Sequence, residues 1–393
     1  MLNLNKKYYI AVVCKVIAVL VSFISSVLIS RGLGVDLKGE YAYITELIEI
    51  LYVIFGMALG QTYATYKYLY GEKIRTIFIE LIFIHGFLAF LICNLIGTLC
   101  GFNLFTIAVL TTIAVIWANI TMVAVIDNSI KRNMITTVID LAGLLILSAL
   151  FYLKIFTLEL VLIYYAVTKI VNIIIILFAY SIKPSYIKIK FTELIRIYKY
   201  CLITMIVMLL ITINYRVDIV MIRHLSSSSE VGIYSVAVTL SNIFLVIPDA
   251  FKEVLFEKAS NGEHKQDAYA SITASIVISG IMIIGFLLFG KWFISLFYGA
   301  EYGSSYNLTL ILWLGTVPLV FFKVLQPIYI SLGKQSIAAI YLGVSAVINI
   351  LVNLSFIRRY NAVGAAWATT ISYSICGVLF LLYYKYNLLK LRT

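Results

Sequence analysis

Charged side chains inside apolar runs are the residues of this chain whose chemistry first requires an explanation. Arg216 and Asp218 stand near the end of one such run, just past mid-chain. A charged group within a membrane helix costs about 2.5–3.5 kcal/mol on insertion scales, so it usually faces a partner, a protein interior or water. Cations of this kind could bind an anion, and carboxylates could bind or exchange a cation. The full set comprises Lys15, Glu46, Glu49, Asp140, Lys169, Arg216, Asp218, Asp249 and Lys323.

Cations that could line a cavity and bind an anionic substrate form a first group. Ser22 and Ser26 follow Lys15 at a spacing that returns to one helical face. This stripe favours a cavity-lining cation, and the alternative is a lysine that reaches the interface, with serines that help helices pack. Lys323 lies between two prolines, which free backbone carbonyls and are tolerated where a cavity supplies partners. The candidates are Lys15, Arg31, Arg216 and Lys323.

Carboxylates that could bind a coupling ion form a second group. Glu46 and Glu49 are neighbours on a helix and repel each other when both are ionised, so a bound proton or cation would stabilise the pair. The alternative is that both carboxylates lie near the outer interface and are solvated by water. Asp218 shares a helical face with Asn214, whereas Arg216 points away from it. Arg216 and Asp218 could each serve substrate binding or coupling, or belong to a structural ion-pair network. The candidates are Glu46, Glu49, Asp218 and Asp249.

The elements that must position these residues are membrane helices. Of the 393 residues, 63% are hydrophobic and 12% are charged, and the mean hydropathy is +1.03. Apolar runs of about 20 residues recur, and each is long enough to cross about 30 Å of hydrocarbon as a helix. Asp140 and Lys169 are expected to form a structural pair between two such helices. The sequence predicts an all-α integral membrane protein with about twelve helices, approximately at 8–30, 43–66, 76–98, 105–126, 134–156, 158–180, 200–222, 233–255, 269–289, 306–330, 337–356 and 363–384.

Lysine and arginine residues indicate the orientation, because they hold short loops on the cytoplasmic side. Most of those in loops fall on the same side as the N-terminus, which predicts that both termini are cytoplasmic. The net charge of +12 is therefore assigned to topology, and no nucleic-acid partner is expected. The basic linker between the halves is either an amphipathic helix on the membrane surface or a solvated loop. The expected domains are a six-helix bundle at 1–182, the linker at 183–199 and a second bundle at 200–393.

Sequence signatures of catalysis and metal binding are missing from the chain. It contains no Walker A loop, no nucleophile elbow and no pair of histidines at metal-binding spacing. Its five cysteines and three histidines are scattered, and most of the cysteines fall in apolar runs. We therefore expect no enzymatic activity, no metal and no cofactor. The energy for any transport would come from a proton or sodium gradient, from the substrate gradient or from a partner.

Several stretches together are similar to one family. They are Ser-Arg-Gly-Leu-Gly-Val-Asp-Leu-Lys-Gly-Glu-Tyr ending at Tyr41, then Arg216-Val-Asp218 with Gly232-Ile-Tyr234, Ser331-Leu-Gly-Lys334, and Val363-Gly-Ala-Ala-Trp-Ala-Thr-Thr370. In order and spacing they resemble polysaccharide flippases of the O-antigen (Wzx) type, in the superfamily of multidrug, oligosaccharidyl-lipid and polysaccharide exporters. The stretch from Arg31 to Tyr41 is also echoed from Arg223 to Tyr234, which indicates two similar halves.

The resemblance implies two six-helix bundles around a central cationic cavity that work by alternating access. It implies an undecaprenyl-pyrophosphate-linked oligosaccharide as substrate, carried to the outer leaflet of a bacterial inner membrane for O-antigen, lipopolysaccharide or other surface polysaccharide assembly. Membrane lipids, a polysaccharide polymerase and a chain-length regulator are the further partners it suggests. Lys15, Arg31 and Arg216 lie where cavity cations of the family occur, whereas the second helix here carries Glu46 and Glu49.

Two other functions are compatible with a chain of this kind. A drug or small-metabolite exporter of the same superfamily would carry cationic substrates, so its cavity should be acidic, and the basic residues here argue against it. A membrane-embedded polysaccharide polymerase should have a large outer loop with catalytic residues, and the outer loops expected here are short.

Overall fold

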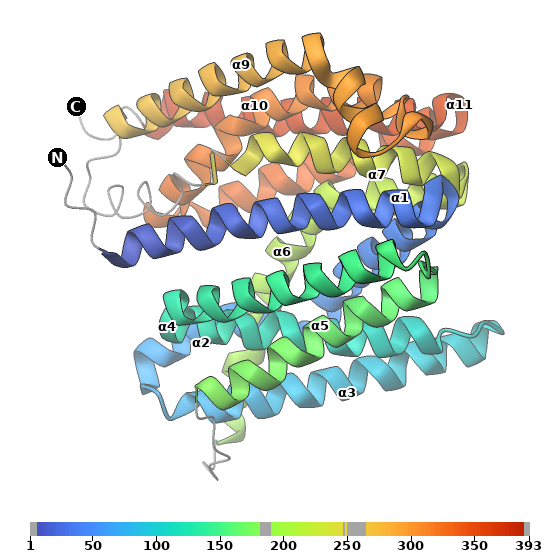
Figure 1. Cartoon of the computed structure of the whole chain (residues 1–393). Coiled ribbons are helices and arrows are strands. Elements are labelled where there is room, and N and C mark those ends of the chain that lie inside the picture. Colours follow the sequence, from blue (N-terminus) through green and yellow to red (C-terminus); the bar gives the residue numbers. More distant parts are fainter. Residues whose placement is uncertain (1–5, 181–189, 247, 250–264, 389–393) are drawn as a thin grey trace. The chain divides into compact units, whose positions relative to one another are not determined.

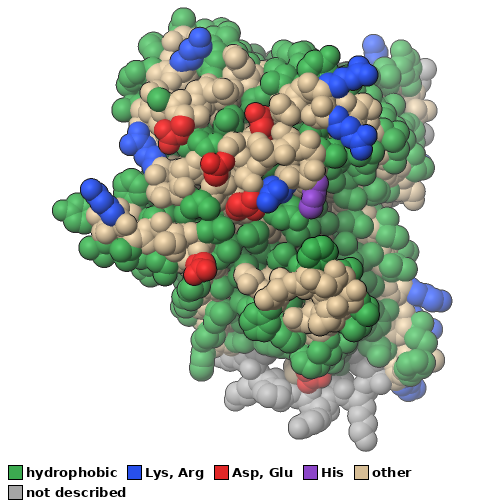
Figure 2. Space-filling model, turned by 90° about the vertical axis from the view of Figure 1, so that its right-hand side faces the viewer, with side chains coloured by type: hydrophobic (Ala, Val, Ile, Leu, Met, Phe, Trp, Pro, Cys, Tyr) green, Lys and Arg blue, Asp and Glu red, His purple; other side chains and the backbone are tan. Residues whose placement is uncertain are grey.

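The computed structural model describes residues 6–180, 190–246, 248–249 and 265–388. Within these ranges the chain is almost entirely helical and contains no strand, and eight helices are long and apolar enough to cross a membrane (Figure 1). On the face drawn in Figure 2, hydrophobic side chains cover much of the surface, and charged side chains lie in scattered places. The helices are α1 (Lys6–Gly56), α2 (Leu59–Tyr70), α3 (Ile74–Cys100), α4 (Phe105–Tyr152), α5 (Leu158–Ala179), α6 (Phe191–Leu225), α7 (Ser228–Asn242), η1 (Ile243–Leu245), α9 (Lys265–Phe297), η2 (Ala300–Tyr302), α10 (Ser305–Ser331), α11 (Gln335–Tyr383) and η3 (Tyr384–Leu388).

Three of the long helices each run from one expected membrane span into the next. Their backbones leave helical geometry at Gly34 in α1 (φ 72°), Asn128 in α4 (φ −160°) and Asn361 in α11 (φ 50°). Gly and Asn tolerate positive φ better than other residues, which suits them to two of these breaks. All three breaks fall in loops that the sequence predicts. The eighth expected span begins with α7 and η1, and its remainder lies largely outside the described residues.

The second expected span, 43–66, is not one continuous helix, which corrects that prediction. Met57 (φ 49°) and Ala58 (φ 51°) are both left-handed and separate α1 from α2. The side chain of Asn119 accepts a hydrogen bond of 2.7 Å from the Gly60 N–H, and His85 Nδ1 donates one of 2.7 Å to the Phe55 carbonyl. Buried side chains thus satisfy backbone groups that the break leaves without helical partners, which lipid could not do.

The chain forms two compact units, each with its own apolar core. The first comprises Met1–Leu33 and Ile44–Thr212, and the second comprises Gly34–Tyr43 and Ile213–Thr393. Part of the expected linker, 183–189, lies outside the described residues, and 191–199 form the first turns of α6. On these turns Leu194 and Tyr198 pack on the core of the first unit.

Within the second unit, the two echoed stretches of sequence cross in close contact. A Cβ atom built on Gly39 would lie 1.8 Å from the Ser228 carbonyl oxygen, and one on Gly232 would lie 2.1 Å from the Val35 carbonyl oxygen. Each glycine therefore faces the carbonyl four residues before the other glycine. The sequence repeat corresponds to a symmetric crossing at which both helices need a residue without a side chain.

Candidate functional site

Asp218 is the centre of a buried polar cluster in the second unit. Its side chain is 2% exposed and accepts hydrogen bonds from the Tyr234 hydroxyl, from Thr369 Oγ1 at 3.0 Å and from the Ile219 N–H at 2.8 Å. These donors come from α6, α7 and α11, which meet here. Several donors on one buried carboxylate stabilise its anionic form, and such a group could bind a cation or exchange a proton.

A track of buried amides and hydroxyls connects α6 to α11 in the same unit. Ser345 Oγ donates to Asn214 Oδ1 at 2.8 Å, and Asn349 Nδ2 donates to Ser372 Oγ at 3.1 Å. Asn353 Nδ2 continues the track to Asn349 Oδ1 at 3.0 Å. Sequence reasoning missed these residues. The signal that could have revealed them is the spacing of Ser345, Asn349 and Asn353, which places a polar residue at every fourth position of an apolar helix.

Lys323 and Asp249 form an ion pair in the second unit. Lys323 Nζ lies 3.2 and 3.1 Å from the two carboxylate oxygens of Asp249, and their side chains are 12% and 32% exposed. The same ammonium lies 5.2 Å from the ring centre of Tyr215, whose hydroxyl is buried without a hydrogen-bond partner. The structure thus joins a predicted cavity cation to a predicted coupling carboxylate. An anion that approached this ammonium would also meet the negative charge of Asp249 beside it.

The other candidate residues are divided between the units. In the first unit, Lys15 and Arg31 are exposed on α1, and Glu46 and Glu49 are half-buried further along it. Arg216 is half-buried on α6 in the second unit. A cavity that these cations share therefore stays a prediction.

Other charged residues of the first unit have protein partners. Asp127 binds Lys67 Nζ at 2.5 Å and Arg75 at 3.1 Å, and this cluster was not found by sequence reasoning. The Lys169 ammonium lies 3.3 Å from the ring centre of Trp117, a cation–π contact. Lys169 also interacts electrostatically with Asp140, its expected partner.

Comparison with known proteins identifies the fold. The chain is 27% identical to the probable low-salt glycan biosynthesis flippase Agl15 of Haloferax volcanii over 176 residues, which are 41% of this chain and 36% of that protein. No family model matches. The structure of the lipid II flippase MurJ in an inward closed conformation matches 96% of this chain and 87% of that chain, with a TM-score of 0.75 and 13% identity. The chain has the fold of this flippase.

A multidrug resistance MATE transporter of the MOP superfamily, in an inward-facing conformation, also shares this fold. It matches with a TM-score of 0.70 and 12% identity over 93% of each chain. Together these likenesses confirm the prediction of an all-α membrane fold with about twelve helices in two bundles.

Proposed function

We propose that this protein is a flippase that moves a lipid-linked oligosaccharide across the membrane by alternating access. The observation that carries the proposal is the whole-chain likeness to a lipid II flippase in a chain with cations inside its membrane helices. The partial match to a glycan biosynthesis flippase supports it independently. The proposed substrate is an undecaprenyl-pyrophosphate-linked repeat unit for O-antigen, lipopolysaccharide or another surface polysaccharide.

The chemistry of such a substrate explains why a protein needs these residues. A bare pyrophosphate cannot cross hydrocarbon, because an isolated charge there is prohibitively unfavourable. Lys15, Arg31 and Arg216 would form charge-assisted hydrogen bonds to it, and Lys323 would join them when it leaves Asp249. The lipid chain would stay in apolar surroundings throughout.

Cation coupling is part of the proposal, with Asp218 as its main group. Asp218 is the most deeply buried of the four candidate carboxylates, and it holds three hydrogen-bond donors in place. Proton or sodium occupancy of this cluster would change the charge between α6 and α11. Glu46 and Glu49 are the corresponding candidates in the first unit.

We place the protein in the bacterial inner membrane with both termini in the cytoplasm, and assign it no enzymatic activity. A polysaccharide polymerase and a chain-length regulator are proposed as functional partners. The second candidate function is export of drugs or small metabolites, which the likeness to a MATE transporter favours. The basic residues favour an anionic substrate instead.

Deletion of the gene tests the two functions against each other. A flippase predicts loss of the electrophoretic ladder of surface polysaccharide, with unchanged drug sensitivity. Increased drug sensitivity with a normal ladder would support the exporter. In the complemented deletion strain, Lys15→Ala and Arg216→Ala are each expected to reduce surface polysaccharide while the protein stays in the membrane. A normal ladder with both changes together would rule out the cationic cavity.

A further inference from the structure

Two consecutive non-glycine residues have a left-handed backbone at the break between α1 and α2, in the first unit. Met57 has a φ of 49°, and Ala58 has a φ of 51° and a ψ of 30°. Elsewhere in the described part of the chain, no two neighbouring residues both have positive φ. This region is unfavourable for L-residues, because Cβ comes too close to the following carbonyl oxygen. Alanine is also the best helix former, so the residues themselves favour a continuous helix here.

Two side chains from other helices replace hydrogen bonds that the break removes. In a continuous helix the Phe55 carbonyl would accept from the backbone N–H four residues later, and the Gly60 N–H would donate to the carbonyl four residues earlier. Here His85 Nδ1 donates to the Phe55 carbonyl at 2.7 Å, and Asn119 Oδ1 accepts from the Gly60 N–H at 2.7 Å. A side chain thus satisfies one partner of each of these two bonds.

Asn119 on α4 lies against both of the glycines that flank the break. A Cβ atom built on Gly56 would lie 2.6 Å from Asn119 Nδ2, and one on Gly60 would lie 2.8 Å from the Asn119 carbonyl oxygen. The Asn119 side chain is buried and also donates to the Val115 carbonyl at 2.9 Å. Two glycines four residues apart share one face of a continuous helix, and such a face can pack closely on a neighbouring helix. The sequence therefore suits a continuous helix as well as the broken one.

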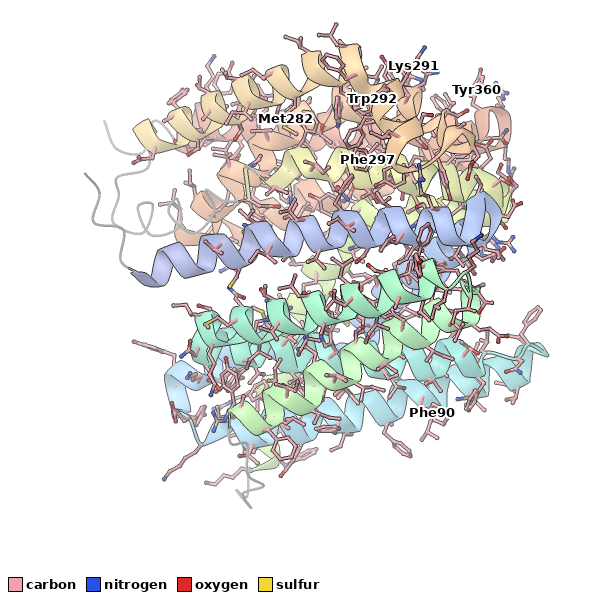
Figure 3. All side chains as sticks on the ribbon, in the orientation of Figure 1. Phe90, Met282, Lys291, Trp292, Phe297 and Tyr360 are labelled. Carbon is pink, nitrogen blue, oxygen red and sulfur yellow. The ribbon has the colours of Figure 1, made fainter. Side chains whose placement is uncertain are left out.

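The helices beside the break form a frame to which α2 is attached. Phe90 on α3 (Figure 3) packs edge-on against Phe105 at the start of α4, with 6.0 Å between the ring centres. α2 lies against α4 (Figure 1). Near the end of α2, Lys67 Nζ lies 2.5 Å from the carboxylate of Asp127 on α4. This ion pair holds α2 on the frame.

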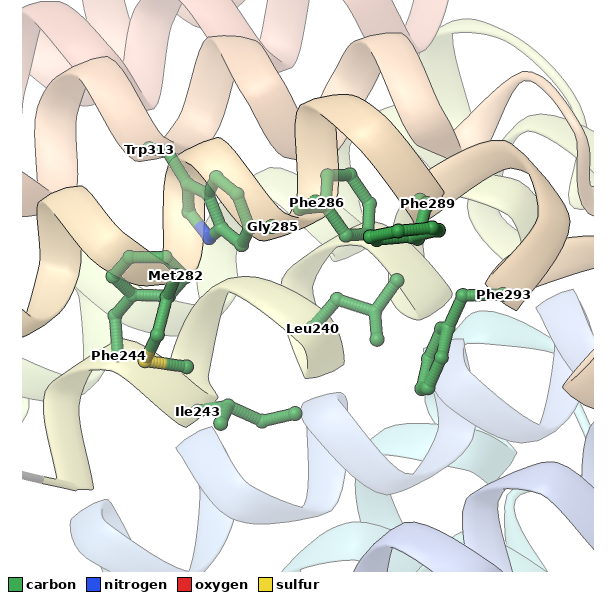
Figure 4. A pocket seen from close by; sticks show the side chains of 10 residues that line it. Leu240, Ile243, Phe244, Met282, Gly285, Phe286, Phe289, Phe293 and Trp313 are labelled. Carbon is green, nitrogen blue, oxygen red and sulfur yellow. The ribbon is translucent and has the colours of Figure 1, made fainter.

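The corresponding helix of the second half is also interrupted, but close to a proline. α7 ends at Asn242 and continues as the short 3₁₀ helix η1, whose Ile243 and Phe244 line an apolar recess (Figure 4). Pro248 follows, and a proline ring clashes with the carbonyl four residues before it, here that of Phe244. The first 183 residues of the chain contain no proline. Tertiary contacts, rather than a proline, therefore maintain the break in the first half.

We propose that Met57 and Ala58 form a pivot, at which the second membrane span changes between this broken form and a continuous helix. The left-handed backbone disfavours the broken form, whereas the hydrogen bonds of His85 and Asn119 favour it. Because these opposing contributions are of similar size, both forms are populated. Residues 44–56 lie between the pivot and the segment that belongs to the second unit. A change at the pivot turns these residues while α2 stays on α4.

Double electron–electron resonance between two spin labels measures this exchange. The labels are attached through Ile54→Cys on α1 and Tyr68→Cys on α2, at positions that are 38% and 91% exposed, with Cys100→Ser as the background. A continuous helix holds these two positions about 21 Å apart, at about 1.5 Å per residue, and the broken form gives a different distance. In nanodiscs we expect the labelled protein to show both distances.

Substitutions at the pivot and beside it should change the ratio of the broken form to the continuous form. Ala58→Gly should raise this ratio about fivefold or more, because glycine adopts the left-handed region without steric penalty. Ala64→Gly, at an exposed position within α2, is the matched control and should leave the ratio unchanged. Asn119→Leu should lower the ratio about fivefold, because it removes the hydrogen bond to Gly60.

His85 provides a second pair of variants in case Asn119→Leu does not fold. His85→Gln loses the bond to the Phe55 carbonyl and should lower the ratio, whereas His85→Asn keeps a donor there and should not. A single distance that is the same in the unsubstituted protein, Ala58→Gly and His85→Gln would show that the break is a fixed kink, and would overturn the inference. The measurement needs no substrate, so its outcome does not depend on the proposed function.

Discussion

At the residue scale, the charge of Asp218 decides whether the buried cluster responds to cations. Asp218→Asn keeps the shape of the side chain but removes its charge, so the side chain no longer attracts a cation or takes up a proton. In vesicles with an imposed proton or sodium gradient, we expect the wild type to flip faster and the variant to be indifferent to the gradient. Asp140→Asn, in the first unit, is the control and should keep the response. A gradient response in Asp218→Asn would exclude this residue from coupling.

The ion pair of Lys323 and Asp249 gives a second prediction at this scale. Asp249→Ala leaves a largely buried ammonium without its carboxylate, which is more destabilising than removal of both groups. The double variant with Lys323→Ala should therefore recover about 1–3 kcal/mol relative to the sum of the two single changes. Thermal unfolding of the purified proteins measures this. We expect the double variant to regain stability but not flipping activity, because it lacks the Lys323 cation. If it regained both, the ion pair would have a structural role only.

Part of the site was predictable from the sequence, because charged residues are conspicuous within apolar runs. Asp218 and Lys323 stand out by charge alone, whereas the partners that define their chemistry do not. Tyr234 and Thr369 are ordinary residues of membrane helices until α7 and α11 bring them to Asp218. Helical spacing shows which residues share a face of one helix, but it does not show which other helix that face meets.

At the element scale, a histidine side chain bonds to the backbone at the break between α1 and α2. His85 Nδ1 donates to the Phe55 carbonyl, and the Tyr198 hydroxyl lies 3.0 Å from Nε2. His85→Asn can place an amide donor near the position of Nδ1, whereas His85→Gln resembles Nε2 and leaves the carbonyl without a partner. We expect His85→Gln to be less stable than His85→Asn by about 1–3 kcal/mol in thermal unfolding. Equal stability of the two variants would show that the carbonyl contact is unimportant.

The spans were predictable from sequence, but this break was not. Hydrophobic runs of sufficient length mark membrane helices, and Gly34, Asn128 and Asn361 fall where turns are expected. Met57 and Ala58 carry no turn signal, because neither residue favours positive φ. Distant side chains stabilise their conformation, so the signal is in the tertiary structure.

At the scale of the whole molecule, the segment Gly34–Tyr43 belongs to the second unit although its neighbours on both sides belong to the first. Its contacts there are polar as well as close. The Asp36 carboxylate accepts a hydrogen bond from the Ser229 hydroxyl. The Glu40 carboxylate forms an ion pair with Arg223, in which Oε1 lies 2.7 Å from a guanidinium nitrogen. If the transport cycle requires this segment to leave the second unit, a bond that holds it there blocks the cycle. We therefore expect that a bond between the segment and the second unit stops transport.

Cysteines at Asp36 and Ser229, joined by a short reducible bifunctional thiol reagent, provide the test. Cys100 is the one exposed native cysteine in the described part of the chain, so Cys100→Ser serves as the background. Flipping in vesicles should fall at least tenfold on cross-linking and return on reduction. The control pair is Lys291→Cys with Tyr306→Cys, which joins α9 to α10 where the ammonium lies 5.4 Å from the ring centre. Both of its residues lie in one continuous part of the second unit, so that bond should leave flipping unchanged. Full activity with the Asp36–Ser229 bond in place would mean that transport proceeds without release of this segment from the second unit.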